Sequence, residues 1–217
     1  MVKILFLVSG NGGNLKFFHT SLSIIKISSV SIFAIADRQC GAVVFANKNS
    51  IPHAVVSYNR NNNKELLAKL SQINPDVIIT NWHKIIDKET VSLFRGKLIN
   101  LHYSLLPAFG GLIGTAPITK AFDLGCKYVG ATCHYVDEGV DTGKIISQTI
   151  VKTNVKLNCA IEQVFRNGCL ILLNTIIKFF LLNSAEWIIN IKEEFAPALL
   201  FDDSIFDDVF WDDLSKL

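Results

Sequence analysis

The fold is decided by the stretch MVKILFLVSGNGGN, residues 1–14. Its apolar run from Ile4 to Val8 is typical of a strand covered on both faces of a parallel sheet. The glycines and asparagines that follow predict a turn, and residues 14–27 then predict a helix. We interpret the apolar segment as a buried first strand and not as a signal peptide, because the turn stands where a cleavage region would be.

The same alternation continues along the chain. Strands are predicted over residues 2–8, 30–36, 53–57 and 77–80, with helices over residues 14–27, 41–49 and 63–73. Such strands are parallel and joined by right-handed crossovers. Later strands are predicted over residues 99–102, 129–136 and 144–151, and helices over residues 117–124 and 158–182. The expected fold class is α/β, with a doubly wound, mostly parallel sheet.

The composition fits one globular domain with a short appendage. The chain has 217 residues, of which 50% are hydrophobic, which is enough for a sizeable core. Residues 192–217 hold eight acidic and two basic side chains, a net charge of −6, which leaves +8 on the rest. We therefore expect a domain over residues 1–183 and an acidic extension over residues 184–217, packed on the domain or at a dimer contact.

Several partner classes are excluded by the same data. No dense Lys/Arg stripe is interleaved with aromatic residues, so no nucleic acid is expected. The apolar run over residues 169–182 is too short to span a bilayer and is interrupted by Asn174 and Lys178, so no membrane is expected. The five cysteines lack paired spacing, which predicts reduced thiols in the cytoplasm. A mildly basic body suits an anionic small molecule.

The predicted strand that ends at His102 carries polar residues where acyl-transfer chemistry needs them. Asn100 and His102 share one face, about 7 Å apart along the backbone, so both side chains can reach one ligand atom. An amide donor beside an imidazole is suited to stabilise an oxyanion. An ordinary strand-end histidine is the alternative reading of His102.

Two loops add further candidates. The turn that contains Gly12, Gly13 and Asn14 opens a helix, where backbone N–H groups favour an anion such as phosphate, but a plain tight turn explains the glycines equally well. In the loop over residues 137–143, the carboxylates of Asp137, Glu138 and Asp141 compete as a catalytic group. Spacing alone does not choose among them.

The segment NLHYSLLP (residues 100–107), followed by His134 and by DTG (residues 141–143), resembles the folate-dependent formyltransferases of the glycinamide ribonucleotide transformylase type. The resemblance runs from the first loop, residues 9–15, to about Val151. It implies that Asn100, His102 and Asp141 are catalytic, with Asp141 favouring a protonated His102. Ser104 and His134 would support the site.

The resemblance also implies two ligands. The substrate phosphate would lie on Gly12, Gly13 and Asn14, and the formyl donor would be 10-formyltetrahydrofolate. The folate pocket would be lined by Trp82, His83, Lys84, Ile85 and Ile86 and by Val136, Asp137, Glu138, Gly139 and Val140. A cis peptide bond is expected between Leu106 and Pro107.

Departures from the family pattern leave the amine acceptor open. Lys84 stands where an arginine is expected, and Tyr103 and the FGG run (residues 109–111) are unusual for the family. The C-terminal tail from residue 195, with its paired aspartates, also differs from the usual ending of these enzymes. Glycinamide ribonucleotide is the favoured acceptor, because of the glycine pattern in the first loop. Alternatives are an amino-sugar nucleotide, hydrolysis of the folate, and a non-catalytic folate-binding relative. The chain could be a monomer or a homodimer.

Three pairs of aspartates, at residues 202–203, 207–208 and 212–213, recur in the tail between apolar residues. They lack the spacing and the glycine turn of a calcium loop. We interpret them as the solvated face of a docked amphipathic segment, and no metal is expected. Cys133 is expected in the core.

Overall fold

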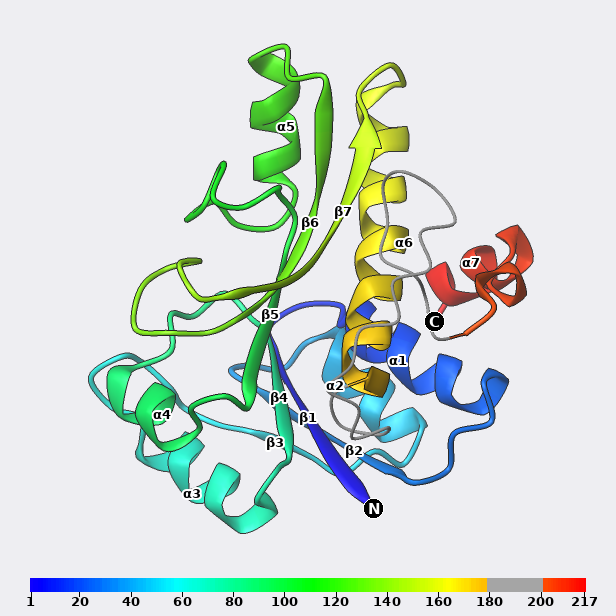
Figure 1. Ribbon diagram of the computed structural model, residues 1–217. Coiled ribbons are helices and arrows are strands. Elements are labelled where there is room, and N and C mark those ends of the chain that lie inside the picture. The colour runs from blue at the N-terminus through cyan, green and yellow to red at the C-terminus, as the bar shows by residue number, and fades with distance from the viewer. Residues whose placement is uncertain (179–200) are drawn as a thin grey trace. The chain divides into compact units, whose positions relative to one another are not determined.

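The computed structural model describes residues 1–178 and 201–217 (Figure 1). The chain divides into two compact units, unit 1 comprising residues 1–98 and 201–217 and unit 2 comprising residues 99–200. The described residues form seven strands interspersed with helices, which confirms the α/β class. The predicted division into residues 1–183 and 184–217 stays a prediction, since residues 179–200 lie outside the described part.

Unit 1 contains a parallel sheet of four strands. These are β1 (Val2–Val8), β2 (Val30–Ala36), β3 (His53–Val55) and β4 (Val77–Asn81), in the order β3-β2-β1-β4. The central strand β1 is the apolar run of the opening stretch, and residues 4–8 are at most 1% exposed. The prediction of a parallel strand covered on both faces is therefore confirmed.

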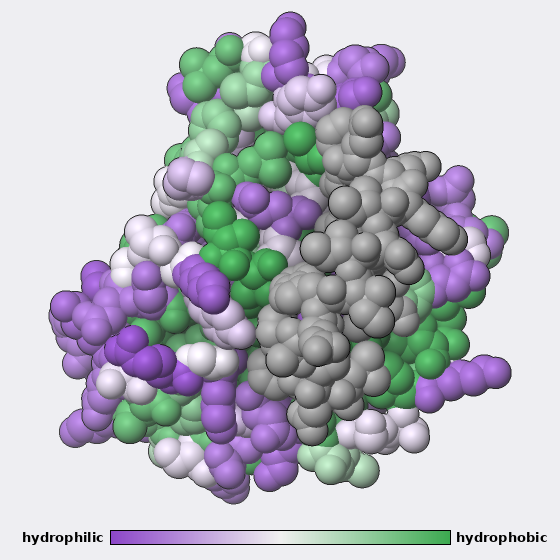
Figure 2. All heavy atoms as spheres, viewed as in Figure 1, coloured by the Kyte–Doolittle hydropathy of each residue, from purple (hydrophilic) through white to green (hydrophobic). Residues whose placement is uncertain are grey.

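Four helices cover this sheet: α1 (Gly13–Ile24), α2 (Gly41–Lys48), α3 (Lys64–Ile73) and α4 (Lys88–Leu93). Figure 1 shows α1 and α2 on one side of the strands and α3 and α4 on the other. On α3 the buried residues are Leu66 and Leu70, four positions apart on one face. The surface over α3 and α4 is mostly hydrophilic in Figure 2, as amphipathic helices on the outside of a sheet require.

Helix α4 was not predicted, although its start has a recognisable cap. The Asp87 side chain accepts hydrogen bonds from the backbone N–H and the hydroxyl of Thr90, at 2.9 and 2.7 Å. Asp at an N-cap followed three residues later by a bonded N–H is a standard helix start.

Unit 2 contains β5 (Leu98–His102, all but its first residue), β6 (Tyr128–Tyr135) and β7 (Ile145–Lys152), which pair antiparallel in the order β5-β6-β7. Helix α6 (Leu157–Ile176) packs along β6 and β7, and α5 (Ala116–Asp123) contacts β6 and α6. The last residues of the predicted helix 158–182 lie outside the described part. None of the helices within residues 1–178 and 201–217 is long and apolar enough to cross a membrane.

The described part of the C-terminal segment belongs to unit 1 and docks through aromatic rings. It contains a 3-10 turn, η2 (Asp203–Ile205), and α7 (Asp208–Ser215). Phe206, Trp211 and Leu214 are buried, whereas all six paired aspartates are exposed. The Trp211 ring stacks on Phe17 of α1 at 5.3 Å and an interplanar angle of 5°. The aspartates therefore form the solvated face of an amphipathic segment.

We expect Trp211→Ala to destabilise the protein by about 3 to 5 kcal/mol, because it removes a buried ring and leaves a cavity against Phe17. Val209→Ala on the same helix is the control, since Val209 is 66% exposed. Urea unfolding of both variants measures the difference. Equal unfolding midpoints for the two would contradict the docking of this segment.

Candidate active site

Strand β5 brings Asn100 and His102 to one face, and its pairing with β6 adds a third side chain. Asn100 lies opposite His134 and His102 lies opposite Thr132 in the antiparallel register. Cross-strand neighbours of this kind have Cβ atoms about 4.5 to 5.5 Å apart. Between them on β6, Cys133 points to the other face and is fully buried, as predicted.

The loop over residues 137–143 gives its three carboxylates different roles. The Asp137 carboxylate accepts from Gly139 N–H at 3.1 Å and from the Thr142 hydroxyl at 2.7 Å, so it organises the loop itself. Glu138 is exposed. The backbone of Asp141 has a positive φ of 55°, in the left-handed region. Of the three competing carboxylates, Asp141 is the one that meets the residues of β5.

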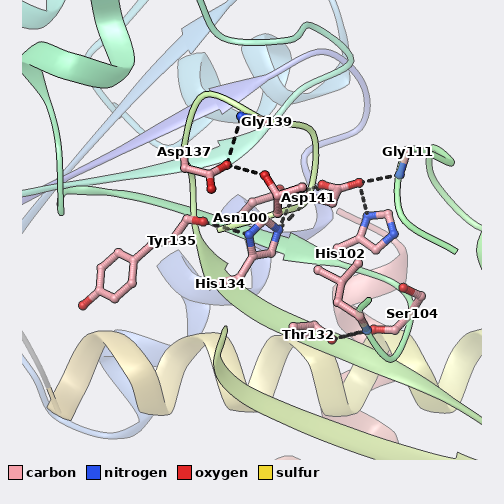
Figure 3. Close-up of polar contacts among 12 residues, drawn as sticks. Asn100, His102, Ser104, Gly111, Thr132, His134, Tyr135, Asp137, Gly139 and Asp141 are labelled. Carbon is pink, nitrogen blue, oxygen red and sulfur yellow. Dashed lines mark hydrogen bonds and ion pairs between the residues drawn. The ribbon is translucent and has the colours of Figure 1, made fainter. Parts of the chain in front are cut away.

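The Asp141 carboxylate joins the candidate residues, as Figure 3 shows. Its Oδ2 lies 3.4 Å from Nδ1 of His102 and accepts from the backbone N–H of Gly111 at 2.8 Å. Its Oδ1 lies 3.4 Å from Nδ2 of Asn100 and 3.7 Å from Nε2 of His134. The structure thus brings together Asn100, His102, His134 and Asp141 within unit 2.

His134 fixes the orientation of the Asn100 amide. Nδ1 of His134 lies 2.8 Å from the carbonyl oxygen of Tyr135, so this nitrogen carries the proton. In the neutral ring Nε2 is then an acceptor, and it faces Nδ2 of Asn100 at 3.3 Å. The carboxylate of Asp141 also only accepts. The NH2 group of Asn100, and not its oxygen, must therefore point towards Asp141 and His134.

The charges of His102 and Asp141 are set by burial and by the contacts of the two side chains. Burial lowers the pKa of His102 from its ordinary value, and this outweighs the nearby Asp141 carboxylate, which raises it. Burial alone would raise the pKa of Asp141, but its contact with His134, the hydrogen bond from Gly111 and the charge of His102 lower it overall. Asp141 thus favours the protonated ring as expected, yet the net effect on His102 is towards the neutral form.

A second layer of hydrogen bonds supports β5 and the loop that follows it. The Thr132 hydroxyl donates to the carbonyl of Ser104 at 2.6 Å and accepts from Leu106 N–H at 3.1 Å. Gln148 donates to that hydroxyl at 2.9 Å and to the Leu106 carbonyl at 3.0 Å. The expected cis bond between Leu106 and Pro107 is present. Sequence reasoning included Ser104 but missed Thr132 and Gln148.

The first loop lies in unit 1. Gly12 is the N-cap of α1 and has a left-handed φ of 70°, while a Cβ there would lie 2.7 Å from that of Ala42. Glycine is therefore required by conformation and by packing. Asn14 is 1% exposed. The tight-turn reading of the loop is correct, and it leaves the phosphate reading open, since the turn opens a twelve-residue helix.

The residues predicted to line a folate pocket fall into two groups. Residues 82–86 lie in unit 1 after β4, where Trp82 and Ile86 are buried and the three residues between them are exposed. Trp82 packs on Tyr58, and its indole N–H is buried without a hydrogen-bond partner among the described residues. Residues 136–140 lie in unit 2, beside Asp141. Within the described residues no group of three or more ligating side chains could hold a metal ion.

Comparisons with known proteins identify the family of this chain. Residues 2–164 match the family model described as formyl transferase. A chloroplastic phosphoribosylglycinamide formyltransferase from Arabidopsis thaliana is 31% identical over 160 residues, covering 69% of this chain and 55% of that protein. A formyltetrahydrofolate deformylase from Escherichia coli K12 is 37% identical over 123 residues, covering 54% of this chain and 42% of that protein. The chain thus spans about half the length of these curated relatives.

A solved structure gives the same result for the fold. The crystal structure of phosphoribosylglycinamide formyltransferase from Bacillus halodurans is 26% identical, with a TM-score of 0.73, and the match covers 86% of this chain and 98% of that one. The family model alone matches well over half of the sequence. The chain belongs to the formyl transferase family.

Proposed function

We propose that this protein transfers a formyl group from 10-formyltetrahydrofolate to a primary amine on a phosphate-bearing acceptor, with glycinamide ribonucleotide as the leading candidate. The observation that carries the proposal is the convergence of Asn100, His102 and Asp141 in unit 2, where the Asp141 carboxylate contacts both of the other side chains. The relatives from Arabidopsis and Bacillus halodurans, which bear the name of this reaction, support the choice of acceptor.

The amide and the imidazole would stabilise the oxyanion. When the amine attacks the formyl carbon, a C–N bond forms and the carbonyl oxygen becomes negative. Nδ2 of Asn100 would donate one hydrogen to that oxygen in place of its long 3.4 Å contact with Asp141, while its other hydrogen stays on His134. Nε2 of His102 now faces the Phe109 carbonyl at 3.3 Å, a long contact that the oxyanion would replace.

Asp141 would carry the proton. The attacking amine must lose a proton, and N10 of the folate must gain one as its bond to the formyl carbon breaks. A carboxylate with a lowered pKa is ionised at neutral pH and can accept the amine proton directly or through water. Its contact with His102 lets the same proton be shared with the ring. The products are the N-formyl acceptor and tetrahydrofolate.

Binding would use the remaining predicted residues. The N–H groups at the start of α1, at Gly12, Gly13 and Asn14, would bind the acceptor phosphate. As the resemblance implies, residues 82–86 and residues 136–140 would each contact the folate, with Lys84 offering a point charge. All five cysteines are free thiols, which supports the proposed cytoplasmic location.

Hydrolysis of the folate is a second candidate function. It is favoured by the Escherichia coli deformylase, whose identity of 37% over 123 residues exceeds that of the Arabidopsis formyltransferase, although over a shorter stretch. Water would replace the amine at the same three residues, and formate would be released. The difference between the two reactions lies in whether an amine is bound.

With 10-formyltetrahydrofolate, we expect tetrahydrofolate to form at least about tenfold faster with glycinamide ribonucleotide than without an amine. The assay follows the folate absorbance and measures formate separately, with amino-sugar nucleotides as further acceptors. Equal rates with and without every amine, and stoichiometric formate, would instead establish hydrolysis.

In the same assay Asn100→Ala should lower kcat by about 100- to 1,000-fold, the usual effect of losing one oxyanion donor. Asp141→Asn should lower kcat as well, because it removes the proton acceptor. Asp123→Asn is the matched control, since Asp123 is an exposed carboxylate at the end of α5 in the same unit. A loss of activity in the Asp123 variant equal to that in the Asp141 variant would disprove this assignment.

His102 should also make stability depend on pH. Its pKa is lowered in the folded protein, so below about pH 6.5 the unfolded chain binds a proton that the folded protein resists. Stability should therefore fall as the pH drops from about 7 towards 5, and His102→Gln should remove part of that fall. Urea unfolding at pH 7.5 and 5.5 measures it. The same loss of stability in the wild type and the variant would refute the lowered pKa.

A further inference from the structure

The segment that follows β2 lies along the first loop. At one end of the contact the Ser9 hydroxyl lies near the Asp37 carboxylate and lowers its pKa. At the other end the backbone N–H of Ala42 donates to the Gly10 carbonyl at 3.0 Å. These contacts bracket residue 38, so its backbone lies beside the loop within unit 1.

Packing between the two segments is close along their length. A Cβ on Gly41 would lie 2.7 Å from Oδ1 of Asn11, and a Cβ on Gly12 would lie 2.7 Å from that of Ala42. Neither segment can shift without the other. The place of Arg38 relative to the loop is therefore set by backbone packing.

The Arg38 guanidinium is held along one edge by a buried carboxylate. Its Nε lies 3.2 Å from Oδ1 of Asp37 and its Nη2 lies 2.7 Å from Oδ2. The Asp37 side chain is 2% exposed, whereas that of Arg38 is 53% exposed. A guanidinium has five N–H donors, so the edge away from Asp37 keeps its hydrogens, and no partner for them occurs among the described residues.

The charges around Asp37 are arranged in favour of its ionised form. Burial would raise the pKa of Asp37, but the hydrogen bonds from Arg38, the nearby Ser9 hydroxyl and the charges of Arg38 and Lys84 lower it overall. The carboxylate is therefore a permanent anchor for the arginine at neutral pH. Arg38 is offered in one fixed orientation, which reduces the side-chain entropy lost when it binds an anion.

The first loop itself supplies no cation. Its sequence lacks the lysine of a P-loop. Lys16, in the second turn of α1, lies over the Phe45 ring at 5.9 Å. A phosphate on this loop would have backbone N–H groups and a helix dipole, yet a doubly charged anion is bound far better with an arginine fork beside it.

From this arrangement we propose that Arg38 is a further phosphate-binding residue, which donates its outer guanidinium edge to the acceptor phosphate, and that Asp37 is the positioning residue that holds it. The proposal rests on the proposed function only in naming the acceptor as the source of the phosphate. Ser9 extends the same network to residue 83, whose backbone N–H donates to the Ser9 hydroxyl at 3.0 Å.

Inorganic phosphate is the probe for a direct test. In titration calorimetry Arg38→Gln should raise the Kd for phosphate by about 10- to 100-fold, the usual effect of losing a charge-assisted pair of hydrogen bonds. Arg95→Gln is the matched control, since Arg95 is an exposed arginine elsewhere in unit 1. Arg38→Lys should recover the affinity only in part, because lysine cannot form the fork with Asp37.

The kinetic arm separates binding from chemistry. Arg38→Gln should raise the KM for the acceptor by a similar factor, with kcat and the KM for 10-formyltetrahydrofolate within about twofold of wild type. Asp37→Asn should shift the KM for the acceptor in the same direction. If that variant fails to fold, the variants at Arg38, whose side chain is about half exposed, still test the proposal.

A phosphate Kd for Arg38→Gln equal to that for Arg95→Gln would overturn the proposal. If no acceptor is formylated but phosphate binds in an Arg38-dependent manner, the proposed function fails and Arg38 stands. If formyl transfer occurs with an unchanged acceptor KM in Arg38→Gln, the proposed function stands and the role of Arg38 fails.

Discussion

The carboxylate of Asp141 is the group on which the candidate site depends. It accepts from Gly111 N–H and lies within 3.4 Å of both Asn100 and His102. Asn100 and His102 share a face because a strand has a period of two. Asp141 reaches that face because the loop between β6 and β7 is fastened by Asp137 and turned by a residue with positive φ. One element supplies the donors and another supplies the charge.

Burial and hydrogen bonding oppose each other at this carboxylate. A half-buried Asp would ordinarily resist ionisation, but its donors lower its pKa overall. For His102 the balance goes the other way, and burial prevails over the nearby negative charge. The pair therefore combines an ionised acid with an imidazole that burial shifts towards its neutral form. Each of the two groups can then accept a proton.

Much of the fold could be predicted because it is encoded locally. Strands β1 and β2 have the bounds expected from their apolar runs. The third strand stops at Val55 because its partner β2 ends at Ala36, two elements earlier in the sequence. Helix α4 escaped prediction because it has only six residues and no long apolar period, although Asp87 marks its start.

The candidate site was predictable only in part, for a related reason. The pairing of Asn100 with His102 follows from strand alternation, but the choice of Asp141 over Asp137 and Glu138 depends on which way each side chain points in a loop. Thr132 and Gln148 support the site through the register between strands, which leaves no local signal. Likewise the proposed role of Arg38 depends on its buried partner Asp37 and on the first loop, which lies some 25 residues away in sequence.

The central claim is that Asn100 and Asp141 act as one unit, and a double-mutant cycle on kcat tests it most directly. Asn100→Ala, Asp141→Asn and the double variant are compared with wild type under saturating folate and acceptor. If the residues form one unit, the double variant loses about as much activity as the worse single variant. If the two losses simply multiply, the residues act independently and the account is contradicted.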